Sequence, residues 1–245
     1  MKSRGEIQFL RFPRFAAGLY SKLTQTRPLQ QQYQEIAAYL TGQVQSGRLL
    51  DIGTGPGRLL VEVHKRNPRL QLYGLDISQA MIGLARHNLA GVTTELKMAN
   101  VCATGYEDDF FEAVVCTGSF YLWDRPEQGL EEIHRILKPG CSAHLFETNR
   151  DHDRAAYRAA LKANLKREGL AMRLFGPLLL AKALPMAYRS DEVETIVRRT
   201  SFAGRGRIQN TTLAGLPIWL HIQLTKGGIL EPSSHGDAAQ GAQCG

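Results

Sequence analysis

The sequence predicts an α/β fold: a doubly wound, seven-stranded sheet that is mostly parallel and has an antiparallel final strand. Short apolar segments alternate with amphipathic stretches of about ten residues between residues 48 and 146, which is typical of parallel strands covered by helices. A glycine-rich turn follows the first of these segments. Two more strand-like segments flank a Gly-Leu-Pro turn near the end of the chain and predict the antiparallel edge.

Each element has its own local signal. Apolar runs predict strands over 48–52, 70–75, 95–99, 113–117, 142–146, 207–212 and 218–225. Helical spacing predicts helices over 14–25, 28–41, 57–66, 78–90 and 126–137. Ser78 is expected to cap one helix, Pro126 to begin another, and Lys138-Pro139-Gly140 to end it. The chain then changes character: residues 153–186 are predicted to be helical, and Ser190 to cap a helix that ends near 200.

These elements suggest three parts of the chain. Residues 1–42 form an N-terminal helical segment, and residues 43–229 form the α/β domain with a helical insertion at about 153–186. Residues 230–245 are polar and rich in small residues, so we expect disorder there. A chain of 245 residues buries enough surface to fold without disulfides or a structural metal.

The composition argues against several classes of protein. No apolar run approaches the ~20 residues of a membrane span, and the first residues lack the apolar block of a signal peptide. The four cysteines are far apart and form no Cys-x-x-Cys pair, so we expect neither a zinc site nor a disulfide framework. We therefore expect a cytoplasmic protein without a bound metal; the alternative is a metal held by Glu147, Asp151 and His152, which lie close together in the sequence.

The stretch LLDIGTGPGRLL, residues 49–60, is the most informative in the chain. Its alternate glycines allow positive φ and a close approach of a ligand to the backbone. The spacing differs from the G-x-G-x-x-G of a dinucleotide site. Asp51 disfavours a pyrophosphate but suits an ammonium group, and Asp76 at the end of the next strand is placed to accept from ribose hydroxyls. The pattern indicates a nucleoside joined to an amino acid.

Four segments in order resemble the class I S-adenosylmethionine-dependent methyltransferases, especially their small-molecule branch. These segments are Asp51-Ile52-Gly53-Thr54-Gly55-Pro56-Gly57, Tyr73-Gly74-Leu75-Asp76-Ile77-Ser78, Phe111-Glu112-Ala113-Val114-Val115, and the run from Glu132 to Gly140 that contains Leu-Lys-Pro-Gly. The resemblance covers residues 35 to 150 well and the flanks only in outline. It implies a Rossmann-like methyltransferase fold with S-adenosylmethionine as the cofactor.

The resemblance also implies which residues bind that cofactor. They are Asp51, Gly53, Thr54, Gly55, Gly57, Asp76, Ile77, Met81, Asn100, Val101 and Thr117. Asn100 stands where the family usually has the aspartate of Gly-Asp-Ala, and we expect its side-chain oxygen to accept from the adenine amine. Met81 on its own is better explained as a core residue than as a ligand contact.

The acceptor is expected above the ends of the fourth and fifth strands. Tyr121 and His152 are candidate proton acceptors, and Glu147 is a candidate for orienting an amine or hydroxyl. Methyl transfer from a sulfonium needs alignment more than acid–base chemistry, so the absence of a catalytic triad does not argue against an enzyme. The alternative for His152 is that, with Asp153, it only begins a helix.

A basic segment of the chain is compatible with several kinds of binding partner. Residues 150–189 carry nine basic and three acidic residues, and Arg154, Arg158, Lys162 and Lys166 recur every four residues, so they form one helical stripe. This segment is interpreted as a lid over a small, partly hydrophobic or anionic acceptor, as an RNA-binding surface, as a surface for an anionic membrane, or as a solvated or dimer-forming face.

The sequence thus predicts transfer of a methyl group from S-adenosylmethionine to an O, N, S or C atom of a small molecule. The alternatives are an RNA or lipid methyltransferase, or a catalytically silent methyltransferase-like protein that binds a partner. A nicotinamide-dependent dehydrogenase is a third choice, disfavoured by the glycine spacing.

Overall fold

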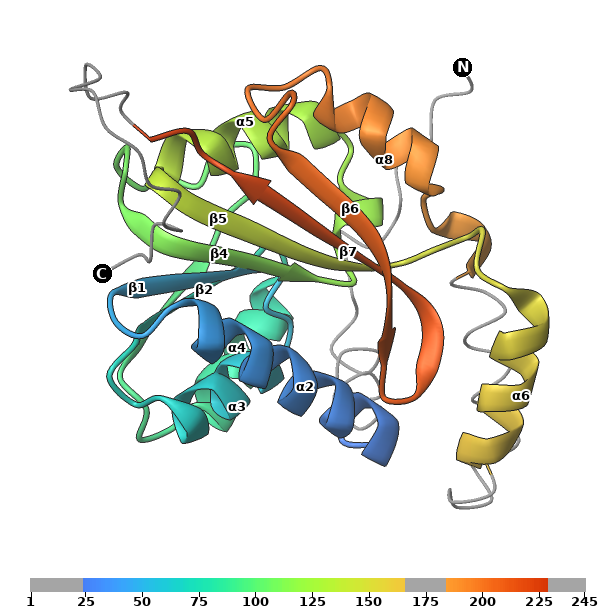
Figure 1. Ribbon diagram of the computed structural model, residues 1–245. Coiled ribbons are helices and arrows are strands. Elements are labelled where there is room, and N and C mark those ends of the chain that lie inside the picture. The colour runs from blue at the N-terminus through green and yellow to red at the C-terminus, as the bar shows by residue number, and fades with distance from the viewer. Residues whose placement is uncertain (1–23, 166–183, 229–245) are drawn as a thin grey trace, which may run out of the picture.

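The computed structural model describes residues 24–165 and 184–228, which form one seven-stranded sheet with helices on both sides (Figure 1). The strand order is β3-β2-β1-β4-β5-β7-β6, with β7 antiparallel to both of its neighbours and the other pairs parallel. The strands are β1 (Arg48–Ile52), β2 (Gln71–Asp76), β3 (Thr94–Met98), β4 (Phe111–Thr117), β5 (Leu137–Thr148), β6 (Gly206–Leu213) and β7 (Leu216–Thr225). The predicted fold class is confirmed.

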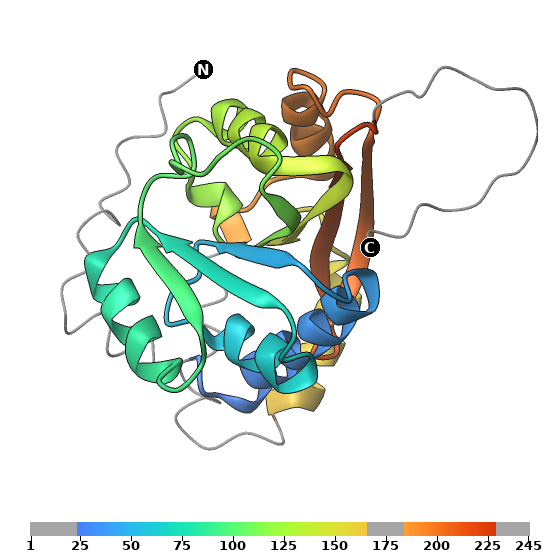
Figure 2. The ribbon, with the colours of Figure 1, turned by 90° about the vertical axis from the view of Figure 1, so that its left-hand side faces the viewer.

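Helices cover the sheet from two sides. They are α2 (Arg27–Gln43), α3 (Arg58–Arg66), α4 (Gln79–Asn88), α5 (Pro126–Ile136), α6 (Arg154–Leu165) and α8 (Ser190–Val197), with short 3₁₀ turns η2 (Phe120–Leu122) and η3 (Leu184–Met186). Helices α2, α3 and α4 lie on one side and α5 and α8 on the other, and the view turned by 90° shows the same separation (Figure 2). Helix α6 stands beside the β6–β7 hairpin.

The central strand β1 is buried on both faces, which explains why its apolar residues do not alternate with polar ones. Leu49 belongs to the core formed with α2 and α3, whereas Leu50 and Ile52 belong to the core formed with α5 and α8. A strand buried on both faces needs apolar side chains at successive positions. Asp51 breaks this run beside the glycine turn, and a buried acid at that place points to the site rather than to packing.

Some helices and strands begin or end at residues other than the predicted ones. Strand β5 begins at Leu137, directly after α5, so the Lys-Pro-Gly stretch that ends the helix is itself extended. It is held there because Gly140 N–H donates to Lys226 O at 2.9 Å. The expectation that Ser190 caps α8 was wrong: Arg189 is the N-cap, its N–H donates to Glu192 Oε2 at 2.9 Å, and the helix ends at Val197.

Several expectations fall wholly or partly outside the described residues. The predicted helix at 14–25, the insertion beyond residue 165 as far as 183, and the tail at 230–245 are among them. Helix α6 confirms the predicted helical conformation for residues 154–165 only. The division of the chain at residues 42 and 229 stays a prediction. Within 24–165 and 184–228, no helix has the length and apolarity that a bilayer span requires.

Candidate active site

The turn between β1 and α3 exposes backbone at the carboxyl edge of the sheet. Gly53, Gly55 and Gly57 have φ of +72°, +52° and +74°, values that favour glycine. At Gly53 a Cβ would also overlap the Ser119 hydroxyl and lie 2.6 Å from Ser119 Cβ. The turn therefore requires glycine for two separate reasons, and the backbone N–H groups at the start of α3 are placed to face a ligand.

Asp76 joins this turn to the end of β2. Its Oδ2 accepts from Gly55 N–H at 2.9 Å, and its Oδ1 accepts from Ser78 N–H at 2.8 Å. Burial raises the pKa of Asp76, although these two hydrogen bonds act in the opposite direction. Because a carboxylate has about four lone-pair sites, both oxygens keep capacity for a further donor such as a ribose hydroxyl.

Asp51 lies deeper, at the end of β1, with only 2% of its surface exposed. Burial raises its pKa to about 7, the Thr54 side chain acts against this rise, and the nearby Asp76 carboxylate adds to it. A carboxyl in this state gains most from a cation, because an opposite charge stabilises its ionised form. Asp51 and Thr54 therefore fit the ammonium end of an amino-acid ligand.

Apolar side chains continue the site beyond Asp76. Ile77 is 44% exposed, which is unusual for an isoleucine next to a strand end, whereas Met81 is buried and its N–H is capped by Ser78 Oγ at 3.4 Å. Ile77 thus presents an apolar side chain to solvent at this edge of the sheet, whereas Met81 belongs to the core. Sequence reasoning missed Met98, which is 55% exposed beside Asp76 at the end of β3.

Asn100 and Val101 follow β3 at the same edge. Val101 is buried, and Asn100 is exposed. The Asn100 Oδ1 that we expected to face adenine accepts from Cys102 N–H at 2.8 Å. The side chain is therefore already oriented by its own turn, and its amide group and second lone pair are what a ligand would meet.

The loop after β4 brings Thr117 and Tyr121 to the same edge, but Glu147 lies beneath the loop. Tyr121 is half-buried in η2, and Thr117 Oγ1 is buried without a hydrogen-bond partner among the described residues. Glu147 is 1% exposed, and its Oε1 accepts from Ser119 N–H at 2.9 Å and Phe120 N–H at 2.8 Å. Burial raises the pKa of Glu147 to about 8, against the effect of those backbone hydrogen bonds.

His152 lies beyond the end of β5 in a defined orientation. Its Nδ1 is 2.8 Å from Asn149 O. A carbonyl only accepts, so Nδ1 is the donor in this contact. The ring also meets Tyr157 edge-on at 5.0 Å. Asp153 accepts from Ala155 N–H at 2.7 Å and caps α6, so the helix-start alternative holds for Asp153 but does not explain the fixed ring of His152.

Helix α6 presents the basic stripe to solvent. Arg154, Arg158 and Lys162 are exposed, and Tyr157 and Leu161 are half-buried. Asn164 Nδ2 donates to Ala214 O at 3.0 Å and ties the helix to the β6–β7 turn. Lys166 lies outside the described residues.

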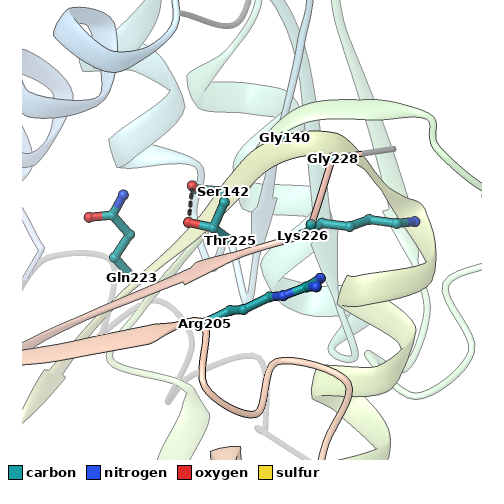
Figure 3. Close-up of a pocket in the computed structure, with 8 residues that line it drawn as sticks. Gly140, Ser142, Arg205, Gln223, Thr225, Lys226 and Gly228 are labelled. Carbon is teal, nitrogen blue, oxygen red and sulfur yellow. Dashed lines mark hydrogen bonds between the residues drawn. The ribbon is translucent and has the colours of Figure 1, made fainter. Parts of the chain in front are cut away.

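A separate hollow of about 620 Å³ lies at the opposite end of β5 and β7 (Figure 3). Arg205 and Lys226 border it, and Ser142 Oγ and Thr225 Oγ1 hydrogen-bond at 2.9 Å inside it. Ser142 pairs with Thr225 whereas Glu147 pairs with Leu220, so the hollow is not part of the glycine-turn site. Among the described residues, no group of three or more His, Cys, Asp or Glu side chains is arranged to hold a metal ion.

The donor set suits S-adenosylmethionine. Two carboxylates, Asp51 and Asp76, lie beside the glycine turn, and a buried hydroxyl at Thr117 lacks a partner among the described residues. Sequence reasoning missed Ser119, which packs beneath Gly53. Its contacts with Ile52 and Gly53 join residues that are far apart along the chain, so no local pattern identifies it.

Comparison with known proteins finds methyltransferases among the similar sequences. Residues 49–140 match the family model described as a methyltransferase domain. Over 111 residues the chain is 34% identical to the ubiquinone/menaquinone biosynthesis C-methyltransferase UbiE of Geobacter sulfurreducens, a match that covers 42% of each chain. An uncharacterized methyltransferase of Bacillus subtilis, YdaC, is 28% identical over 43% of this chain and 58% of its own. The matches thus span about half the length of these relatives.

Solved structures match a larger share of the chain. A SAM-dependent methyltransferase from Aquifex aeolicus is 17% identical with a TM-score of 0.62, over 85% of this chain and 98% of that one. The plantazolicin methyltransferase BpumL in complex with SAH is 16% identical with a TM-score of 0.64, over 89% and 94%. At these identities the likeness concerns the fold. Residues 49–140 thus match a methyltransferase domain, and the likeness to solved structures extends the shared fold over most of the chain.

Proposed function

We propose that the chain transfers the methyl group of S-adenosylmethionine to a small-molecule acceptor. The observation that carries the proposal is the pairing of Asp76 with Gly55 across the ends of β1 and β2, beside the buried carboxyl of Asp51. This arrangement offers a ribose acceptor, a backbone cradle and an ammonium partner within one edge of the sheet. The dinucleotide alternative has no role for a buried acid directly before the glycine turn.

Individual residues have separate tasks in this proposal. Asp76 accepts from the ribose hydroxyls, Asp51 and Thr54 face the amino-acid end, and Ile77 with Asn100 and Val101 borders the adenine. The bound cofactor supplies an activated methyl group on a positively charged sulfur. The protein therefore has to hold the acceptor in line and keep water out, which together account for several kcal/mol of the barrier.

The acceptor side is proposed to lie between the loop after β4 and the loop after β5. Since Nδ1 of His152 donates to Asn149 O, Nε2 is the ring nitrogen that we propose to take a proton where the acceptor must lose one. Tyr121 in η2 is the second candidate for contact with the acceptor, and the half-buried Trp123 packs edge-on against Phe120 at 5.0 Å beside it. An apolar, aromatic wall of this kind favours a ring-bearing acceptor over a highly charged one.

Quinone precursors are the acceptors to test first, because several relatives are named as ubiquinone/menaquinone C-methyltransferases or demethylmenaquinone methyltransferases. The experiment is transfer of labelled methyl from S-adenosylmethionine into a cell extract that is then split into small-molecule, lipid, RNA and protein fractions. We expect label in the small-molecule fraction or, for a prenylated quinone, in the lipid fraction as a quinone. Label in RNA would instead assign the exposed basic stripe of α6 to nucleic acid. Tight cofactor binding with no label in any fraction would favour a silent binding protein.

A further inference from the structure

Glu147 is tied to the loop after β4 rather than directed to solvent. One oxygen, Oε1, accepts from the backbone N–H groups of Ser119 and Phe120, and Cys116 Sγ lies 3.8 Å from the same atom. The other oxygen, Oε2, has no partner among the described residues. We propose that Glu147 is a positioning residue for methyl transfer, which holds the Gly118–Leu122 loop in place through Oε1 and does not itself exchange protons with the acceptor.

The held loop touches both halves of the site. Ser119 Oγ lies 3.3 Å from Ile52 O and 3.0 Å from Cys116 Sγ, directly beneath Gly53. Tyr121, two residues further on, is the candidate acceptor contact. Glu147 therefore fixes a segment that rests on the cofactor turn at one end and carries the acceptor wall at the other. Small displacements of aligned groups cost about 100-fold in rate, so such an anchor bears directly on turnover.

The chemistry of the carboxyl fits this role better than acid–base catalysis. Glu147 is covered on all sides and lies under the loop that would separate it from the acceptor. A buried carboxyl with an unpartnered oxygen costs stability, so its presence is not explained by packing alone. Its elevated pKa means that the neutral acid predominates at pH 7, and a glutamine is the close isostere of that acid.

Glu112 offers a matched control. It is also a nearly buried glutamate whose carboxylate accepts a backbone hydrogen bond, from Arg48 N–H at 2.5 Å. It stands at the start of β4, at the opposite edge of the sheet, and also pairs with Lys138. Although burial acts the other way, the hydrogen bonds from Lys138 and Arg48 hold its pKa below the usual value. A substitution at Glu112 therefore shows the effect of altering a largely buried glutamate that lies away from the candidate site.

The test compares Glu147→Gln with Glu147→Asp, using Glu112→Gln as the control. Glutamine keeps an acceptor oxygen at the same reach, whereas aspartate keeps the acid but withdraws it by one methylene. We expect E147Q to retain kcat within about threefold and E147D to lose about 100-fold at saturating S-adenosylmethionine. A proton-transferring Glu147 predicts the reverse order, with E147Q inactive and E147D active, and that order would overturn the proposal. E112Q should change the free energy of unfolding but leave kcat and cofactor affinity unaltered.

A second readout does not need an acceptor. In the unliganded protein, hydrogen exchange at the amides of Ser119 and Phe120 should be as slow in E147Q as in the parent, and about tenfold faster in E147D. Equal exchange in all three proteins would show that Glu147 does not hold the loop. The inference rests on the proposed function for its link to turnover. A parent protein that fails to bind S-adenosylmethionine defeats the proposed function, whereas unchanged exchange and kcat in E147D defeat only this inference.

Discussion

Asp76 Oδ2 accepts a hydrogen bond from Gly55 N–H at 2.9 Å, although the two residues belong to different turns of the sheet edge. The same carboxylate also holds Ser78 N–H at the start of α4. One side chain therefore sets the distance between the glycine turn and the next helix. The proposed ribose contact would be made by a group that the protein has already oriented, which lowers the entropic cost of binding.

Replacing Asp76 with Asn tests this arrangement. The amide keeps one acceptor oxygen but loses the charge and one of the two backbone partners. Because hydrogen bonds to a charged group contribute about 1.5–3 kcal/mol each, we expect the affinity for S-adenosylmethionine to fall about 100-fold by calorimetry. Asp109→Asn, which removes a surface ion pair with Lys226, should leave the affinity intact. Normal binding by D76N would remove Asp76 from the cofactor site.

The raised pKa of Asp51 predicts that the affinity for the cofactor depends on pH. Its pKa of about 7 in the unliganded protein falls when a cation binds beside it, so binding releases a proton below that pH. The affinity for S-adenosylmethionine should therefore weaken by up to about tenfold for each pH unit below 7. Calorimetry in two buffers with different ionisation enthalpies measures the released proton directly.

The variant Asp51→Asn separates this effect from other groups. It cannot ionise, so its affinity should be weaker than that of the parent at pH 8 and nearly independent of pH between 8 and 5. If the parent and D51N show the same pH profile, another group is responsible and Asp51 does not face the ammonium.

Much of the fold could be predicted because its signals are local. Strand β1 is apolar at successive positions, the glycine turn follows it directly, and Asp76 ends the next strand. Short sequence patterns were therefore enough to predict this edge of the sheet. The antiparallel β6–β7 pair was equally visible from the turn between its strands.

The role of Glu147 could not be read in this way. Its partners are backbone N–H groups at Ser119 and Phe120, 28 and 27 residues earlier, and a backbone donor leaves no trace in the sequence. Sequence position alone placed Glu147 among the candidate catalytic residues, since it ends a strand at the active edge. The cap of α8 was missed for a related reason. Arg189 serves as the N-cap because Glu192 reaches back to its N–H, and Ser190, the better capping residue by type, lies one position inside the helix.

Gly53 predicts a steric effect that can be told apart from backbone strain. An alanine there meets both an unfavourable positive φ and the side chain of Ser119. Gly91 has φ of +85°, and no atom lies within 4 Å of the place that an added methyl group would take, so Gly91→Ala tests strain alone. We expect G91A to lower the free energy of unfolding by about 1–2 kcal/mol. G53A should lose more than this and also lose cofactor binding, as judged by urea unfolding and calorimetry. Equal free energies of unfolding for the two variants would mean that the Ser119 side chain moves aside from the added methyl group without a measurable cost.

A buried histidine pair predicts how the protein responds to acid. His144 Nδ1 lies 3.2 Å from His221 Nε2, and Tyr39 of α2 covers both rings edge-on. Burial lowers the pKa of His144 to about 3, with help from His221, and that of His221 to about 4, with help from Arg207. Histidine in the unfolded chain titrates near 6.5, so below that pH the unfolded state binds more protons than the folded state.

The free energy of unfolding should therefore be unaffected by this pair above pH 6.5 and should fall as the pH drops toward 4. The loss approaches about 2 kcal/mol for each histidine at pH 5. In His221→Phe one of the two titrating groups is gone, and the phenyl ring can keep the stack that His221 makes on Phe146 at 4.6 Å. The decrease between pH 7 and pH 5, measured by urea unfolding, should shrink by about 2 kcal/mol in this variant.

His87→Gln, at an exposed position on α4, should retain the full decrease. An unchanged decrease in H221F would mean that the pair takes up protons without loss of the folded state, and acid sensitivity would then have to come from the carboxylates.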